Sequence, residues 1–147
     1  MEELSKLIDH KLLSVLVVDD NKFTADLVRK ILNAHGISEV YQEYSGETAL
    51  ACLFSNQINV VICDVVMKGM SGLQFTKAVR DGYVPLPGKK ETPIVMLTAH
   101  SEQNIVMASL KIGANGYLVK PIVPKKLMQI ISKSCRSTLP LLTVRGS

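Results

Sequence analysis

The sequence predicts an α/β fold in which helices cover a parallel β-sheet. Short aliphatic runs at residues 15–18, 60–63, 94–97 and 117–119 are rich in β-branched residues and too short to form helices. The stretches between these runs carry apolar residues at helical spacing. Aromatic residues make up only 5% of the chain and tryptophan is absent, so we expect the aliphatic core that buried parallel strands prefer.

The first strand and the first helix are well marked. Residues 15–18 read Val-Leu-Val-Val, which is typical of a strand buried on both faces. A helix is expected to begin near Asn21, whose side chain suits an N-cap, and to end at Gly36. The apolar stripe that should cover the sheet consists of Leu27, Val28, Ile31 and Leu32.

The remaining elements continue the alternation of strand and helix. A second, less apolar strand is expected at residues 39–44, before the turn-like Ser45-Gly46, and it completes a sheet of five strands. Gly113 and Pro124 supply a stop and a start signal for helices. The further helices are predicted at residues 47–56, 72–81, 101–112 and 124–134.

Residues 82–93 interrupt this pattern between the third helix and the fourth strand. They contain three prolines and two glycines, so the sequence predicts an irregular loop. Such a loop can be a contact surface. We favour a tolerated surface insertion, because loops accept added length at small entropic cost.

Length and composition favour one domain. The chain has 147 residues, of which 47% are hydrophobic. We assign the domain to residues 14–136, with a lead-in at 1–13 and a tail at 137–147 whose last three residues resemble a cloning remnant. The net charge of +4 comes from basic residues scattered among 13 acidic ones, so we do not expect a nucleic-acid surface.

The cysteines and the hydropathy pattern indicate a cytoplasmic protein. Cys52, Cys63 and Cys135 show no Cys-x-x-Cys spacing and no secretory leader precedes them, so neither a disulfide framework nor a zinc site is expected. No apolar run approaches the roughly 20 residues that span a bilayer.

Polar side chains follow the predicted strands at their carboxyl ends, where parallel α/β sheets bind ligands. Asp19 and Asp20 follow the first strand, Asp64 the third, Thr98 the fourth and Lys120 the fifth. Three carboxylates that meet at one edge repel one another unless a cation lies between them or their pKa values rise. Mg²⁺ is the expected cation, because it prefers oxygen ligands and keeps positions for water or phosphate oxygens.

A carboxylate beside Mg²⁺ can attack phosphorus and form an acyl phosphate. Lys120 would then offset charge on the transferring oxygens, and the Thr98 hydroxyl would meet the new group. Each residue alone also has an ordinary structural interpretation: an Asp can cap a helix, a Thr can bond to the backbone and a Lys is usually solvated. The five residues together favour the chemical interpretation.

The chain resembles the receiver domain of bacterial response regulators from about residue 14 to residue 134. The motifs that carry this resemblance are Val17-Val18-Asp19-Asp20-Asn21, Cys63-Asp64-Val65-Val66-Met67 followed by Gly72, Met96-Leu97-Thr98-Ala99, and Gly113-Ala114-Asn115-Gly116-Tyr117-Leu118-Val119-Lys120-Pro121. Each motif alone is weak, but their ordered combination is specific. The resemblance implies a flavodoxin-like (βα)5 doubly wound parallel sheet with strand order 2-1-3-4-5.

The resemblance also implies a metal site and an acceptor. It makes Asp64 the phosphoacceptor and, with Asp20, a direct Mg²⁺ ligand. Asp19 would act on the metal through water, and Val66 would contribute its backbone carbonyl.

Three further residues would serve phosphoryl transfer and switching. Lys120 and Thr98 would contact the phosphoryl group, and the ring of Tyr117 would move inward when the Thr98 hydroxyl is drawn to it. The family has a cis bond at Lys120-Pro121, which fits because proline lowers the cis penalty.

One departure from the family pattern concerns the loop after Asp64, and a second concerns two variable positions. The family often has proline after the methionine of this loop, whereas this chain has Lys68 followed by Gly69. Val66 and His100 occupy the variable positions that tune hydrolysis of the acyl phosphate in this family. Because Val66 has no polar group to guide water, we expect slow or moderate autodephosphorylation, and His100 could position water instead.

We therefore interpret the chain as a phosphorylation-controlled switch and not as a turnover enzyme. A histidine kinase or histidine phosphotransfer protein would donate the phosphoryl group, and a downstream protein would read the change of shape. A pseudo-receiver that binds proteins without phosphorylation is the alternative. A phosphatase or flavoprotein is disfavoured, since no Gly-rich phosphate loop is present and Val65 and Val66, not a second acid, follow Asp64.

The sequence leaves the setting of this switch open. It fits a stand-alone protein or one module of a larger regulator or hybrid kinase. It also fits a monomer or a phosphorylation-dependent dimer.

Overall fold

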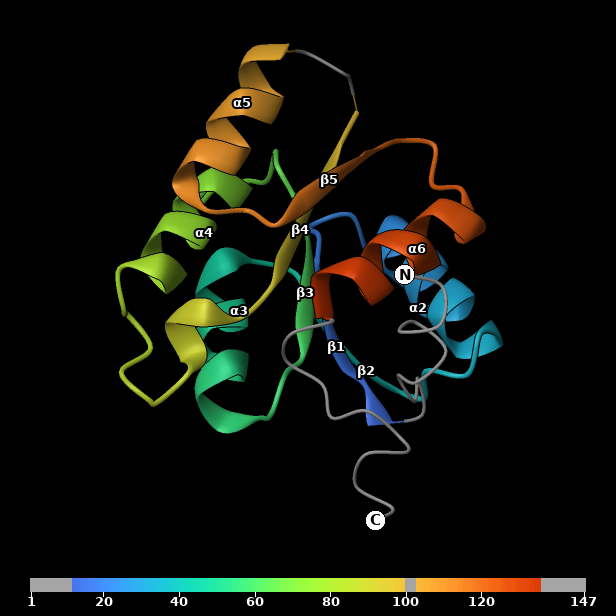
Figure 1. The fold of residues 1–147 in the computed structure, drawn as a ribbon, viewed down its shortest axis with the longest axis horizontal. Helices are drawn as coiled ribbons and strands as arrows, with labels where there is room; N and C mark the ends of the chain where they lie inside the picture. Colours follow the sequence, from blue (N-terminus) through green and yellow to red (C-terminus); the bar gives the residue numbers. More distant parts are fainter. Residues whose placement is uncertain (1–11, 100–102, 136–147) are drawn as a thin grey trace.

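The computed structural model describes residues 12–99 and 103–135, which form a five-stranded parallel sheet with helices on both faces (Figure 1). The strand order is β2-β1-β3-β4-β5, as predicted. The strands are β1 Ser14–Val18, β2 Glu39–Glu43, β3 Val60–Asp64, β4 Ile94–Thr98 and β5 Gly116–Val119. Except for Leu12 and Leu13, the proposed lead-in lies outside the described residues, and so do the tail and His100.

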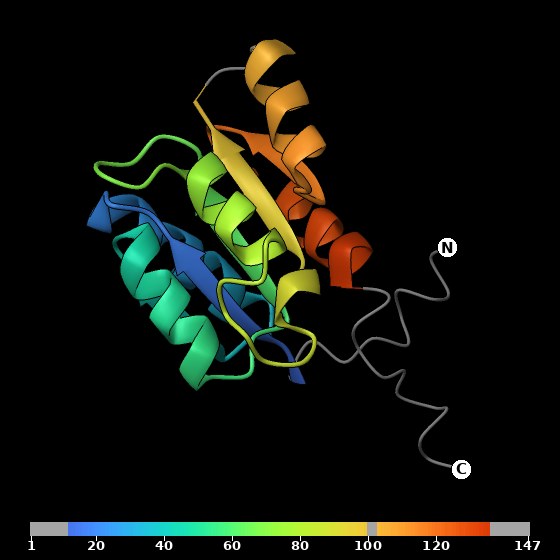
Figure 2. The same ribbon diagram turned by 90° about the vertical axis from the view of Figure 1, so that its left-hand side faces the viewer.

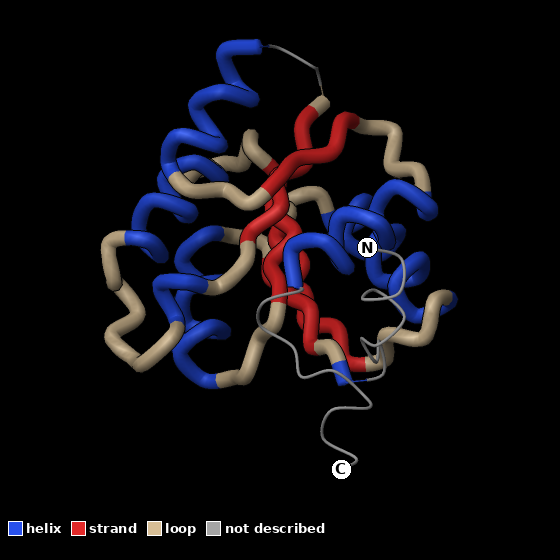
Figure 3. The backbone as a smooth tube through the Cα atoms, in the orientation of Figure 1, coloured by secondary structure: helices blue, strands red, loops and turns tan. Residues whose placement is uncertain are grey.

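The helices occur where the sequence predicts them, to within about two residues at each end. They are α2 Lys22–Ala34, α3 Gly46–Ser55, α4 Gly72–Arg80, α5 Gln103–Ile112 and α6 Pro124–Cys135. Helices α2 and α6 cover one face of the sheet, and α3, α4 and α5 cover the other (Figures 1 and 2). The strands therefore form the middle layer of three (Figure 3).

Alternation along the buried strands divides the core in two. In β1, Leu16 and Val18 pack on the α3 and α4 side, whereas Val15 and Val17 pack on the α2 and α6 side. Strands β3 and β4 alternate in the same way. Because β1, β3 and β4 are buried along their whole length, they form a rigid base for side chains at their carboxyl ends.

Helix α2 begins and ends as predicted, but its buried stripe differs in part. The Asn21 side chain accepts a hydrogen bond from the Thr24 backbone N–H at 3.2 Å, and Gly36 has a φ of 93°. The buried residues of α2 are Ala25, Val28 and Leu32. The prediction was wrong for Leu27, which is 43% exposed. Consecutive helical residues are rotated by about 100°, so the line through 25, 28 and 32 turns residue 27 outward.

The segment 82–93 is less irregular than predicted. It contains a short 3₁₀ helix, Lys89–Glu91. The guanidinium of Arg80, at the end of α4, donates to the backbone carbonyls of Lys90 and Thr92 and to the side chain of Asn115. These bonds tie the segment to the amino-terminal edge of β4, where Asn115 also accepts from the Ile94 N–H at 2.8 Å.

Candidate functional site

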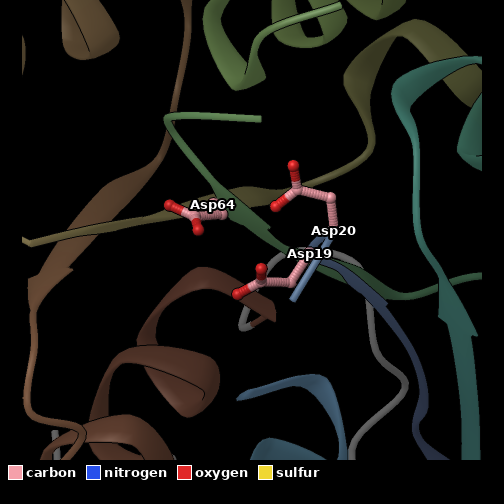
Figure 4. Close-up of side chains that lie close together, drawn as sticks. All are labelled: Asp19, Asp20 and Asp64. Carbon is pink, nitrogen blue, oxygen red and sulfur yellow. The ribbon is translucent and has the colours of Figure 1, made fainter. Parts of the chain in front are cut away.

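The sheet brings the predicted polar residues to one edge. Asp19 directly follows β1, Asp64 ends β3, Thr98 ends β4 and Lys120 directly follows β5. In the register of β3 and β4, Asp64 pairs with Leu97, which is the residue before Thr98. One carboxylate oxygen from each of Asp19, Asp20 and Asp64 lies within 4.8 Å of the other two. Figure 4 shows the three side chains lying close together.

Backbone amides fix one oxygen of each carboxylate. Oδ1 of Asp19 accepts from the Asn21 N–H at 2.9 Å, as the chain turns into α2. Oδ2 of Asp20 accepts from the Lys68 N–H at 2.9 Å. Oδ1 of Asp64 accepts from the Val66 N–H at 3.4 Å. The second oxygen of each carboxylate remains for a ligand or a charged partner.

Lys120 supplies the positive charge of the site. Its Nζ lies 3.1 Å from Oδ2 of Asp64 and 3.8 Å from Oδ2 of Asp19. Its backbone N–H donates to the carbonyl of Thr98 at 2.8 Å, which anchors the start of the β5–α6 loop to β4. The Lys120–Pro121 peptide bond is cis, as the resemblance implied. Lys120 therefore contacts Asp64 directly, within hydrogen-bonding distance.

Asp19 has an electrostatic environment that favours a bound cation. Its side chain is fully buried, and Oδ2 accepts no hydrogen bond from the described residues. Burial raises the pKa of this carboxyl to about 6, and the charges of Asp64 and Asp20 raise it too, although the Asn21 N–H and Lys120 oppose the rise. Three carboxylates thus meet a single ammonium group within the described part of the chain, and oxygen donors of this kind fit Mg²⁺.

The other predicted residues surround this cluster at different distances. Thr98 is buried at the end of β4. Val66 lies beside Asp64 with its side chain 73% exposed, so its backbone faces the site and its side chain faces solvent. Tyr117, in the edge strand β5, is 39% exposed and lines a surface hollow with Val119 and Pro121.

Two features of the site were not predicted from the sequence. The first is the Lys68 N–H, whose bond to Asp20 joins positions 48 residues apart and carries no sequence signal. The second is the close packing at Gly72, where a Cβ atom would collide with the Asp64 carbonyl and lie 2.8 Å from the Met96 side chain. The glycine in the acceptor motif was the available signal for this close approach.

Comparison with known proteins identifies the family. Residues 15–132 match the model of the response regulator receiver domain. The chain belongs to this family. Its five-stranded fold and strand order are those of chemotaxis protein CheY4 of Vibrio cholerae, with a TM-score of 0.75 and 34% identity over 83% of this chain and 98% of that one. This receiver domain is therefore a signalling module of two-component systems.

Further relatives agree with this assignment. The receiver domain is 32% identical to regulatory protein VanR of Enterococcus faecium, over 83% of this chain and 49% of that protein. It is 29% identical to transcriptional regulatory protein YvrH of Bacillus subtilis, over 85% of this chain and 50% of that protein. The chain thus spans about half the length of these two relatives. Among the helices that the structure describes, none has the length and hydrophobicity to cross a bilayer.

Proposed function

We propose that this receiver domain accepts a phosphoryl group on Asp64 and relays it as a change of shape to a protein partner. The observation that carries the proposal is the position of Asp64. Its Oδ2 lies 3.1 Å from Lys120 Nζ, and its carboxylate is clustered with those of Asp19 and Asp20. A nucleophilic carboxylate, an ammonium group and two further acidic groups are the parts that carboxyl phosphorylation requires.

The donor is a histidine kinase or a histidine phosphotransfer protein. An oxygen of the Asp64 carboxylate attacks phosphorus, the N–P bond of phosphohistidine breaks, and the electron pair returns to the imidazole nitrogen. Lys120 and the Thr98 hydroxyl contact the phosphoryl oxygens and offset their charge. The buried strands β3 and β4 hold Asp64 and Thr98, so these two groups are positioned before the donor arrives.

When bound, Mg²⁺ would supply positive charge to the phosphoryl oxygens. Asp20 and Asp64 would hold it directly, the Val66 carbonyl would be a third ligand, and Asp19 would act through a water molecule. The buried Oδ2 of Asp19, which accepts no hydrogen bond from the described residues, supports a cation at this place.

The switch is the movement of Thr98 and Tyr117. Thr98 ends β4, and Tyr117, which lies on the adjacent strand β5 and pairs with Met96, is exposed enough to change its position without disturbing the core. The phosphoryl group would select one of two states of this pair, and a downstream protein would bind that state. The signalling species would be a monomer or a phosphorylation-dependent dimer inside the cytoplasm.

Intact-mass spectrometry after incubation with Mg²⁺ and acetyl phosphate tests the chemistry. The parent should gain about 80 Da, and Asp64→Ala or excess chelator should abolish the gain. If the folded parent binds Mg²⁺ and gains no mass from acetyl phosphate or from a phosphorylated histidine phosphotransfer protein, the domain is a non-phosphorylated adapter. Conversion of an external phosphomonoester with turnover would indicate a phosphatase.

A further inference from the structure

The loop between β3 and α4, residues 65–71, contributes two backbone amides to the acidic cluster. The Val66 N–H donates to Oδ1 of Asp64 at 3.4 Å, and the Lys68 N–H donates to Oδ2 of Asp20 at 2.9 Å. The first bond is local, whereas the second connects this loop to the end of β1. One loop therefore holds two of the three carboxylates.

The core fixes this loop firmly enough to aim its amides. Val65 and Met67 are 5% and 7% exposed and pack in the core beside α3 and α4. The intervening Val66 and the following Lys68 have exposed side chains. The Val65 N–H also donates to the Leu97 carbonyl at 2.9 Å, which ties the start of the loop to β4. Alternate buried side chains thus act as anchors on either side of Val66.

The end of the loop is fixed as well. The Gly72 N–H donates to the Val65 carbonyl at 2.8 Å, which closes the loop on itself. Gly69 has a φ of 72°, a left-handed conformation that favours glycine, so the chain turns immediately after Lys68. The Lys68 amide lies between an anchored residue and this turn.

This hydrogen bond depends on a departure of this chain from the receiver-family pattern. Proline, which the family often has at this position, would offer no backbone N–H to Asp20. Lys68 provides that N–H. Its side chain is exposed and makes no ion pair within the described residues, so its backbone is the part that touches the site.

We propose that the backbone N–H of Lys68 is a positioning group that orients Asp20 toward the bound cation; this inference rests on the proposed function. With Oδ2 engaged by the amide, Oδ1 of Asp20 is the oxygen left for the cation. A carboxylate that is already oriented loses less rotational freedom when it binds. Hydrogen bonds to ligating carboxylates are known to alter metal affinity for this reason.

Two substitutions at position 68 distinguish the role of the backbone N–H from that of the side chain. Lys68→Pro removes the N–H and the ammonium group, whereas Lys68→Ala removes only the ammonium group. Calorimetric titration with Mg²⁺ should give a dissociation constant roughly tenfold higher for Lys68→Pro, and one within about twofold of the parent for Lys68→Ala. Parent-like or tighter binding by folded Lys68→Pro would overturn the proposal, as would equal weakening in both variants.

A third variant, at the adjacent position, covers the case in which Lys68→Pro does not fold. Gly69→Ala places a Cβ where nothing lies within 4 Å, so it acts through the positive φ and not through a clash. It should shift the Lys68 amide and weaken Mg²⁺ binding by several-fold. Unchanged affinity in a variant whose Lys68 amide resonance has moved would count against the positioning role.

Amide hydrogen exchange in the metal-free protein tests the hydrogen bond independently of the metal. The Lys68 amide should exchange about threefold to tenfold more slowly in the parent than in Asp20→Ala, with the Val66 amide as internal control. An equal rate in both proteins would overturn the proposal. If the Lys68 amide exchanges slowly in a parent that binds no Mg²⁺, the hydrogen bond is present and the proposed metal site is wrong.

Discussion

Replacing Asp19 by Asn should stabilise the metal-free protein at neutral pH, although it alters a buried and hydrogen-bonded side chain. The pKa of Asp19 rises from 3.8 to about 6 on folding, mainly through burial. A pKa difference of one unit corresponds to about 1.4 kcal/mol, so ionised Asp19 costs the folded state about 3 kcal/mol at pH 7.5. Asn keeps the oxygen that accepts from the Asn21 N–H and removes the charge.

The sign of the pH dependence follows from this raised pKa. Well below pH 3.8 the carboxyl is protonated in both states, and burial of Asp19 then carries no electrostatic penalty. As the pH rises toward 6 the unfolded chain loses the proton first, so the free energy of unfolding of the parent falls through this window. The amide group of Asn would face the Lys120 ammonium, which reduces the gain in stability. We therefore expect a net gain of about 1–3 kcal/mol for Asp19→Asn at pH 7.5, and almost none at pH 3.5.

Urea unfolding followed by far-ultraviolet circular dichroism measures this gain, with chelator present at both pH values. Asp20→Asn is the matched control, because Asp20 is exposed and its loss should change stability by less than about 1 kcal/mol. Mg²⁺ should stabilise the parent more than Asp19→Asn. Destabilisation of Asp19→Asn at pH 7.5, or an equal gain at both pH values, would refute the electrostatic reasoning.

Three further predictions concern other parts of the site. Gly72→Ala should destabilise the domain by roughly 3 kcal/mol, because its Cβ would collide with the Asp64 carbonyl. Gly36→Ala should cost only about 1 kcal/mol, through its positive φ. Thermal unfolding compares the stabilities of the two variants. Lys120→Met should slow phosphorylation by acetyl phosphate by roughly a hundredfold, and a parent-like rate by quenched intact mass would remove Lys120 from the transfer step. The acyl phosphate should persist for minutes, because the Val66 side chain offers no polar group; a lifetime of a few seconds after donor removal would contradict this expectation.

The sequence predicted the elements that depend on local signals. The β-branched runs predicted the buried strands, and Asn21 and Gly36 marked the ends of α2. The exposure of Leu27 shows where pattern reading fails. Leu is more hydrophobic than Ala, so the sequence pattern placed Leu27 in the buried stripe. In the structure, the face of α2 that packs on the sheet contains Ala25 instead.

Hydrogen bonds that backbone groups make to distant residues were beyond sequence reasoning. The strand ends brought Asp19, Asp64 and Lys120 together as expected, because parallel strands share one carboxyl edge. The Lys68 N–H and the Arg80 bonds to segment 82–93 involve backbone groups, which look alike at every position of a sequence. Only the path of the chain shows which of these groups meet a partner.

Phosphorylation of Asp64 is tested by locating the phosphoryl group after incubation with acetyl phosphate and Mg²⁺. Borohydride reduces an aspartyl phosphate to homoserine, which peptide mass mapping assigns to one position. Homoserine is expected at position 64, because Asp64 is the carboxylate that Lys120 contacts at 3.1 Å. Homoserine at position 19 or 20, or a phosphorylated chain with none at 64, would contradict this assignment.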